Sequence, residues 1–334
     1  MNRRRALSTI GGGLFALGSF RAVDNVLLGY GHVDDGTNLL DQGLDGLLDE
    51  RLELGPVVVE GEGEGGAYEL VVSPGEERGW LRPAGGEWSS FAHTAEAARE
   101  VEDEHGLDGA LVALVEDAAE VDRGRHRYEF HGPGAFFDRI DGVNHRPAIT
   151  GAMRGSVADP VSPATVTGFA KVDPADPEAL AYGLVEAFRE HGSYDLARYV
   201  GGSIQDNVLM GRVNLRAPFE EPTDLDSLAD SGHTGLFCWE LTYRAIEAFH
   251  ATRAVEQRRP VVAFWVRDRR HKHVYNGLAT AFLDGELTVA VTFLDYTHST
   301  LYHDLRLTGV TGEGLAAYDE WHRADEVHWD VPAL

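Results

Sequence analysis

Short runs of apolar residues separated by polar ones cover the first half of the chain and predict a mixture of strands and helices. Val57–Val59 and Tyr68–Val72 are apolar runs on either side of a Gly/Glu segment, and each predicts a strand. A helix is predicted over residues 94–105, entered through Thr94. The other elements predicted here are strands at 110–115 and 127–130 and a short helix at 133–140.

The second half of the chain has a clearer helical period. Asp176 and Pro177 open a predicted helix that ends at Gly192, and residues 193–195 are expected to form a turn. The Gly-, Ser-, Asp- and Pro-bearing stretch 154–163 predicts a linker. The helix is supported by apolar residues at helical spacing, namely Leu180, Leu184, Val185 and Phe188.

These patterns predict an α+β protein in two folded parts. A small acidic α+β domain is expected over residues 30–165. Residues 166–334 are expected to form a domain in which helices pack on an antiparallel sheet. The first 29 residues stand apart as a signal segment or an N-terminal helix.

One helix in the second half is expected to carry a reactive thiol. Thr234 can cap a helix that places Cys238, the only cysteine, in its first turn. Backbone N–H groups and the positive end of the helix dipole stabilise a thiolate there. The alternative is that Cys238 is a small apolar residue of the core.

Two predicted strands, 274–282 and 287–294, follow this helix and form a hairpin around Gly285. A three-residue turn with Gly285 in the left-handed conformation would place His273 directly opposite Asp295. A two-residue turn at 284–285 would instead put these two residues on opposite faces. We expect the first arrangement.

The strand face that carries His273 has unusually small side chains, because it continues through Gly277, Ala279 and Ala281. Small side chains allow a helix to approach a sheet closely, so the Cys238 helix is expected to pack on this face. His273 would then act as a general base toward the thiol, and Asp295 would orient the imidazole. His271, in the same basic loop, competes with His273 for the role of base.

A Gly-x-x-Cys-Trp sequence at a helix start, a strand beginning with histidine, a hairpin and a strand ending in aspartate together resemble the transglutaminase-like family of cysteine enzymes. The resemblance covers residues 170–300. It implies a papain-like core in which Cys238 is the nucleophile, His273 the base and Asp295 the orienting group. It further implies acyl transfer or amide hydrolysis on a peptide or protein amide, without a cofactor. One departure is that two residues, rather than the usual one, separate Gly235 from Cys238.

The charge balance changes what partners are expected. The chain has 55 acidic and 29 basic side chains, a formal net charge of −26 and only two lysines, Lys171 and Lys272. Phosphate backbones would be repelled, so nucleic acid is not expected as a partner. Abundant acid with scarce lysine resembles the composition of halophilic archaeal proteins, in which carboxylates keep the surface hydrated in concentrated salt.

The N-terminus resembles a twin-arginine export signal, because Arg3–Arg5 precede a short apolar stretch that ends at Arg21. An exported or cell-surface protein is therefore expected, and a cytoplasmic protein with an ordinary first helix is the alternative.

Two other function classes compete with the cysteine enzyme. One is a metal site among the C-terminal residues His298, His303, Asp304, His322 and His328. The other is a non-catalytic surface or assembly module that keeps the fold and tolerates Cys238→Ala. Tyr318, Trp321 and Trp329 are expected to belong to a C-terminal helix packed on the core.

Overall fold

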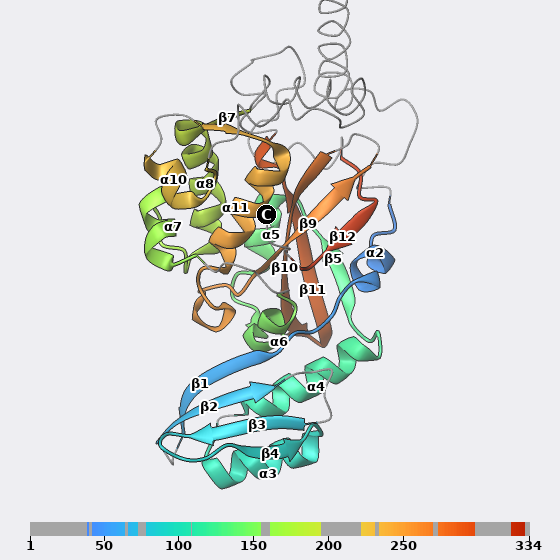
Figure 1. The fold of residues 1–334 in the computed structure, drawn as a ribbon. Coiled ribbons are helices and arrows are strands. Elements are labelled where there is room, and N and C mark those ends of the chain that lie inside the picture. Colours follow the sequence, from blue (N-terminus) through green and yellow to red (C-terminus); the bar gives the residue numbers. More distant parts are fainter. Residues whose placement is uncertain are drawn as a thin grey trace, which may run out of the picture.

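The computed structural model confirms the α+β class, with helices packed against one antiparallel sheet and one mixed sheet (Figure 1). The structure describes part of the chain. The predicted signal segment, His271, His298, His303, Asp304, Tyr318 and Trp321 lie outside it. The described residues are 39, 42–63, 66–72, 78–107, 109–154, 161–194, 222–230, 234–269, 273–297 and 322–330.

A small lobe contains a four-stranded antiparallel sheet, sheet A, with two helices packed on it (Figure 1). The strands predicted at 57–59 and 68–72 are confirmed as parts of β1 and β2. The predicted helix cap is also confirmed, because the Thr94 hydroxyl accepts a hydrogen bond from the Ala97 N–H at 3.3 Å. The elements are β1 (Val57–Gly63), β2 (Gly66–Val72), β3 (Arg78–Pro83), β4 (Ser89–Ala92), α3 (Ala95–His105) and α4 (Ala110–Asp122).

The strand predicted at 110–115 is wrong, since these residues form the first half of α4. Leu111, Leu114, Val115 and Ala118 are all buried. Their spacing follows one face of a helix, which buries more apolar surface than a strand ending at residue 115 would.

A second sheet, sheet B, holds the elements that position the candidate site. Its strand order is β12-β9-β10-β11-β5, and β6 pairs with β10. The strand predicted at 127–130 is confirmed as β5, which runs parallel to β11. Because β5 and β6 come from the region 30–165, both predicted regions contribute strands to this sheet. The bounds are β5 (Arg127–Phe130), β6 (Asn144–His145), β9 (Val262–Asp268), β10 (His273–Asp284), β11 (Glu286–Leu294) and β12 (Glu326–His328).

Most of the helices gather on one side of sheet B (Figure 1). The helix predicted to open at Asp176 is confirmed as α8, and its Asp176 carboxylate accepts a hydrogen bond from the Ala179 N–H. The predicted turn at 193–195 is wrong for its described part, because Gly192–Tyr194 form strand β7. The bounds are α2 (Asp45–Glu50), α5 (Pro133–Arg139), α6 (Pro147–Ala152), α7 (Pro163–Ala170), α8 (Pro177–His191), α10 (Leu225–Asp230), β8 (Thr234–Leu236), α11 (Cys238–His250) and the 3₁₀ turn η4 (Ala254–Glu256).

Helix α11 packs on the opposite face of β10 from the predicted one. Its apolar residues share a core with Leu278 and Phe282, whereas Ala279 and Ala281 belong to a second core on the other face. The side-chain amide of Asn276 also donates to the Thr242 carbonyl of α11 at 2.9 Å. The expectation that α11 lies on the small-residue face is therefore wrong.

The small residues of β10 accommodate other neighbours instead. Phe264 of β9 is the cross-strand partner of Gly277, and its ring lies over the glycine. A Cβ built on Gly277 would lie 2.1 Å from Cζ of that ring. Farther along the strand, the Ala281 N–H donates to the Thr150 hydroxyl of α6 at 3.0 Å. Gly277 thus leaves room for the Phe264 ring, and Ala281 lies next to α6 in the second core.

Gly277→Ala is expected to destabilise the protein by about 1–3 kcal/mol, because the new methyl group overlaps the Phe264 ring in a packed core. Denaturant unfolding measures the loss. The double variant Gly277→Ala, Phe264→Leu should lose less than the two single losses combined, since the smaller side chain makes room. A Gly277→Ala protein as stable as the wild type would contradict this packing.

The β10–β11 hairpin differs from the expected register by two residues. Asp284 pairs with Glu286 across Gly285, whose φ is +76°, and Asn276 pairs with Leu294. Continuing this register places Asp295 opposite Tyr275. His273 and Asp295 therefore share one face as diagonal neighbours, and the prediction that they lie directly opposite is wrong. The turn is centred on Gly285, one position later than the predicted three-residue turn.

The C-terminal described segment forms a strand where a helix was expected. Residues 326–328 are β12, which pairs with β9, and the following Trp329 is buried against Phe264 with ring centroids 4.6 Å apart. The Trp329 indole donates to the Leu48 carbonyl at 3.0 Å, which joins α2 to this end of the chain. The predicted core position of Trp329 is confirmed. The predicted helix is wrong for its described part, residues 322–330.

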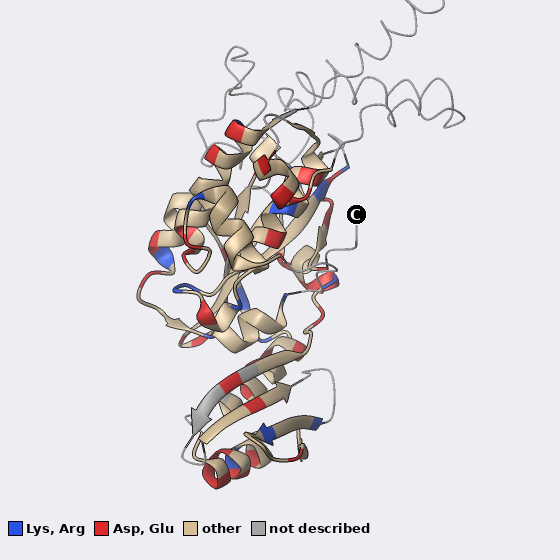
Figure 2. Cartoon of the chain, turned by 60° about the vertical axis from the view of Figure 1, so that its left-hand side comes forward, with Lys and Arg blue, Asp and Glu red and all other residues tan. Residues whose placement is uncertain are grey.

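Acidic side chains are spread over both lobes (Figure 2). This distribution fits a solvated acidic surface rather than one acidic binding face. No helix among the described residues has the length and apolar character needed to cross a membrane.

Candidate active site

Cys238 is the first residue of α11, and the segment before it is fixed by strand pairing. Strand β8 pairs in parallel with β7, the strand that directly follows α8, and Leu236 pairs with Tyr194 in this register. The helix start is then capped by Glu240, whose carboxylate accepts a hydrogen bond from the Phe237 N–H at 2.7 Å. Cys238 is in the first helical turn, as predicted. The predicted cap is wrong, because Thr234 lies in β8.

The start of α11 lies beside the start of β10. The Thr242 hydroxyl, one helical turn after Cys238, donates to the Val274 carbonyl at 3.2 Å. Cys238 is accordingly placed next to His273, the residue before Val274, and its thiol is within hydrogen-bonding reach of that side chain. Cys238 is a partly exposed residue, whereas His273 is 1% exposed. A partly exposed cysteine beside a buried imidazole is suited to attack on an external substrate.

Asp295 completes the predicted group. It follows the last residue of β11, is 2% exposed, and its Oδ2 lies 2.7 Å from His273 Nε2. An ionised carboxylate only accepts hydrogen bonds, so the proton of this bond belongs to His273 Nε2. The other ring nitrogen, Nδ1, is then the one that can take a proton from the Cys238 thiol. All three predicted site residues are thus brought together at one end of sheet B.

The charges in this site stabilise each other. Burial disfavours the charged form of His273, but the charge and hydrogen bond of Asp295, together with Cys238, outweigh burial and raise the His273 pKa to about 10. Burial would raise the pKa of Asp295, but the charge of His273 and the hydrogen bonds from His273 and His322 hold it well below its ordinary value. The imidazole is therefore held as an imidazolium through neutral pH.

A fourth group, His322, belongs to the same cluster, and the sequence pattern did not reveal this. Its Nε2 lies 2.7 Å from the same Asp295 oxygen, and the residue is 1% exposed. The predicted C-terminal metal cluster had grouped His322 with His328. In the structure His328 lies elsewhere, stacked on Trp265 with ring centroids 3.7 Å apart.

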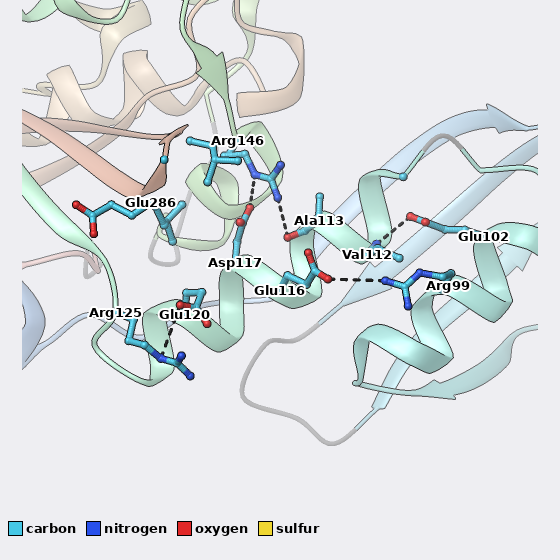
Figure 3. A pocket seen from close by; sticks show the side chains of 14 residues that line it. Arg99, Glu102, Val112, Ala113, Glu116, Asp117, Glu120, Arg125, Arg146 and Glu286 are labelled. Carbon is cyan, nitrogen blue, oxygen red and sulfur yellow. Dashed lines mark hydrogen bonds and ion pairs between the residues drawn. The ribbon is translucent and has the colours of Figure 1, made fainter.

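One pocket is separate from this site. It has a volume of about 520 Å³ and lies between α3, α4 and the tip of the β10–β11 hairpin (Figure 3). Its charged side chains pair with one another. Arg146, for example, donates to both the Asp117 carboxylate and the Ala113 carbonyl. A pocket whose charges are already paired in this way gives no indication of a ligand.

Comparisons with family models, with curated proteins and with solved structures found no match to this chain.

Proposed function

We propose that the protein is a transglutaminase-like cysteine enzyme that transfers or hydrolyses the acyl group of an amide. The observation that supports this proposal is the convergence of a partly exposed thiol, a buried imidazole and a buried carboxylate from three separate elements. The resemblance of the Gly-x-x-Cys-Trp helix start and the His and Asp strand positions to that family is consistent with the same chemistry.

In the proposed reaction the Cys238 thiolate attacks the carbonyl carbon of the amide and forms a tetrahedral intermediate. The backbone N–H of Cys238 is a suitable donor to the oxyanion, because a first-turn N–H has no acceptor within its own helix. When the C–N bond breaks, the His273 imidazolium gives its proton to the departing amine. A thioester on Cys238 remains.

The second half of the reaction releases the acyl group. The neutral His273 takes a proton from water or from an acceptor amine, and the resulting nucleophile attacks the thioester carbonyl. Hydrolysis gives a carboxylic acid, and transfer gives a new amide. Asp295 keeps the imidazole in one orientation and stabilises its charged form throughout. The chemistry requires no cofactor.

An activated ester tests this proposal without knowledge of the natural substrate. With p-nitrophenyl acetate, we expect a burst of p-nitrophenolate of about one equivalent per chain, followed by slower turnover. Mass spectrometry of the quenched protein should place one acetyl group on Cys238. Acetylation that occurs only on Lys171, Lys272 or the N-terminus, without a burst, would overturn the proposal.

A second candidate function is cation binding, because ligand-type atoms of His273, Asp295 and His322 all lie within 4.8 Å of one another. The spacing favours the enzyme. Both imidazoles lie 2.7 Å from one carboxylate oxygen, a hydrogen-bond distance. Ligands around a tetrahedral zinc ion are about 3.3 Å apart, given bonds of about 2.0 Å. Metal analysis of the purified protein distinguishes the two functions. The cation site would be favoured if the protein contained one zinc per chain and if a chelator removed the zinc and unfolded the protein.

A further inference from the structure

Two imidazoles share one oxygen of Asp295 at the base of the site. His273 Nε2 and His322 Nε2 each lie 2.7 Å from Asp295 Oδ2, and all three side chains are buried. An ionised carboxylate accepts and does not donate, so each Nε2 must carry a proton. Asp295 therefore accepts a hydrogen bond from each imidazole, and one of these donors, His273, also interacts with Cys238.

His322 is itself fixed by contacts that have no part in the proposed chemistry. The Leu39 N–H donates to the His322 carbonyl at 2.8 Å. The Tyr275 hydroxyl donates to the carbonyl of the next residue, Arg323, at 2.9 Å. The Tyr275 ring meets the His322 ring edge-on with centroids 4.9 Å apart and lies nearly parallel to the His273 ring at 5.9 Å. One tyrosine thus contacts both imidazoles.

We propose that His322 is a positioning residue that holds the Asp295 carboxylate in the orientation needed to align His273 with Cys238. This role rests on the proposed function. With a single donor the carboxylate could turn about its Cβ–Cγ bond, and the His273 ring would turn with it. A second donor on the same oxygen prevents that rotation, because turning the carboxylate would leave a buried imidazole N–H without its acceptor.

Two substitutions of His322 separate positioning from packing. His322→Gln keeps an N–H donor near the position of Nε2, whereas His322→Phe keeps a ring and removes the donor. We expect His322→Phe to lower the rate of Cys238 alkylation by iodoacetamide at pH 6 about tenfold, and His322→Gln to stay within about threefold of the wild type. A packing role predicts the reverse order, so that order would overturn the proposal.

The wild-type protein offers a second readout that does not depend on a folded variant. In protein labelled with ¹⁵N-histidine, we expect two slowly exchanging, downfield Nε2–H protons, from His273 and His322. Asp295→Asn should remove or shift both signals. A wild-type spectrum with no such proton from His322 would show that it does not donate to Asp295, and would overturn the proposal.

The two proposals fail differently. If iodoacetamide does not alkylate the wild-type thiol at pH 6, the proposed function is overturned, and so is the proposed role of His322. A reactive wild-type thiol whose His322→Phe variant reacts equally fast overturns only the role of His322.

Discussion

Cys238→Ala is expected to abolish both the burst with p-nitrophenyl acetate and all covalent labelling, and to leave the fold intact. Cys238 is the only cysteine, so the variant has no thiol to form a thioester. We expect the burst amplitude to fall to zero and the steady rate to fall at least about 10³-fold, the scale of loss when a nucleophile is removed. Stopped-flow absorbance and intact-protein mass spectrometry measure the two quantities.

Cys238→Ser is the matched control, because it replaces sulfur by oxygen at nearly constant shape. It should unfold at the same denaturant concentration as the wild type and should still lose the burst. If Cys238→Ala kept full activity toward the ester, the thiol would not be the nucleophile. The assembly-module alternative, which tolerates this substitution, would then be the better account.

Asp295→Asn is expected to lower turnover about 10³- to 10⁴-fold, which is the effect of the equivalent change in serine proteases. The neutral amide cannot stabilise the His273 imidazolium. Where its NH₂ group faces Nε2, it forces the proton of a neutral His273 onto Nδ1, and Nδ1 can then no longer accept the thiol proton. Steady-state kinetics with p-nitrophenyl acetate should show the loss in kcat with little change in KM.

Asp117→Asn is the matched control for this change. Asp117, in α4, is also a buried acid, but it pairs with Arg146, and no hydrogen bond or ion pair among the described residues joins it to Cys238, His273 or Asp295. Its replacement should cost stability and leave kcat unchanged. An Asp295→Asn protein that retained more than about a tenth of wild-type kcat would contradict the role proposed for Asp295.

The grouping of Cys238, His273 and Asp295 could be predicted from sequence because each residue has a local signal. Cys238 comes just before an amphipathic helical pattern, while His273 and Asp295 border two strands joined at a glycine. Alternation with period two put His273 and Asp295 on one face, and the two-residue error in register preserved that parity. The prediction that His273 and Asp295 share a face was therefore right, although the predicted cross-strand pairing of these residues was wrong.

The packing of α11 could not be predicted in this way. Small residues on β10 indicate a close neighbour but do not identify it, and at Gly277 the neighbour is a ring from the adjacent strand. Both faces of β10 are buried, so burial did not distinguish them. Pattern alone could not decide which face the helix covers.

His322 had no local signal at all. It enters the site because β12 pairs with β9 at the edge of sheet B, which brings the preceding residues toward Asp268 and His273. The apolar alternation in a three-residue strand is too short to predict either the strand or its partner. A residue placed by long-range strand pairing of this kind can be found only from the fold.

The most direct test of the account is the pH dependence of Cys238 alkylation by iodoacetamide in the wild-type protein. The pKa of His273 is raised to about 10, so the imidazolium persists from acidic pH up to that value and is available to activate Cys238 as proposed. We predict rapid alkylation at pH 6 with little increase toward pH 9, and a rate at pH 6 about 100-fold lower in His273→Gln. A wild-type rate that rises about tenfold per pH unit from pH 6 to a midpoint near 8.5, as for an ordinary thiol, would contradict it.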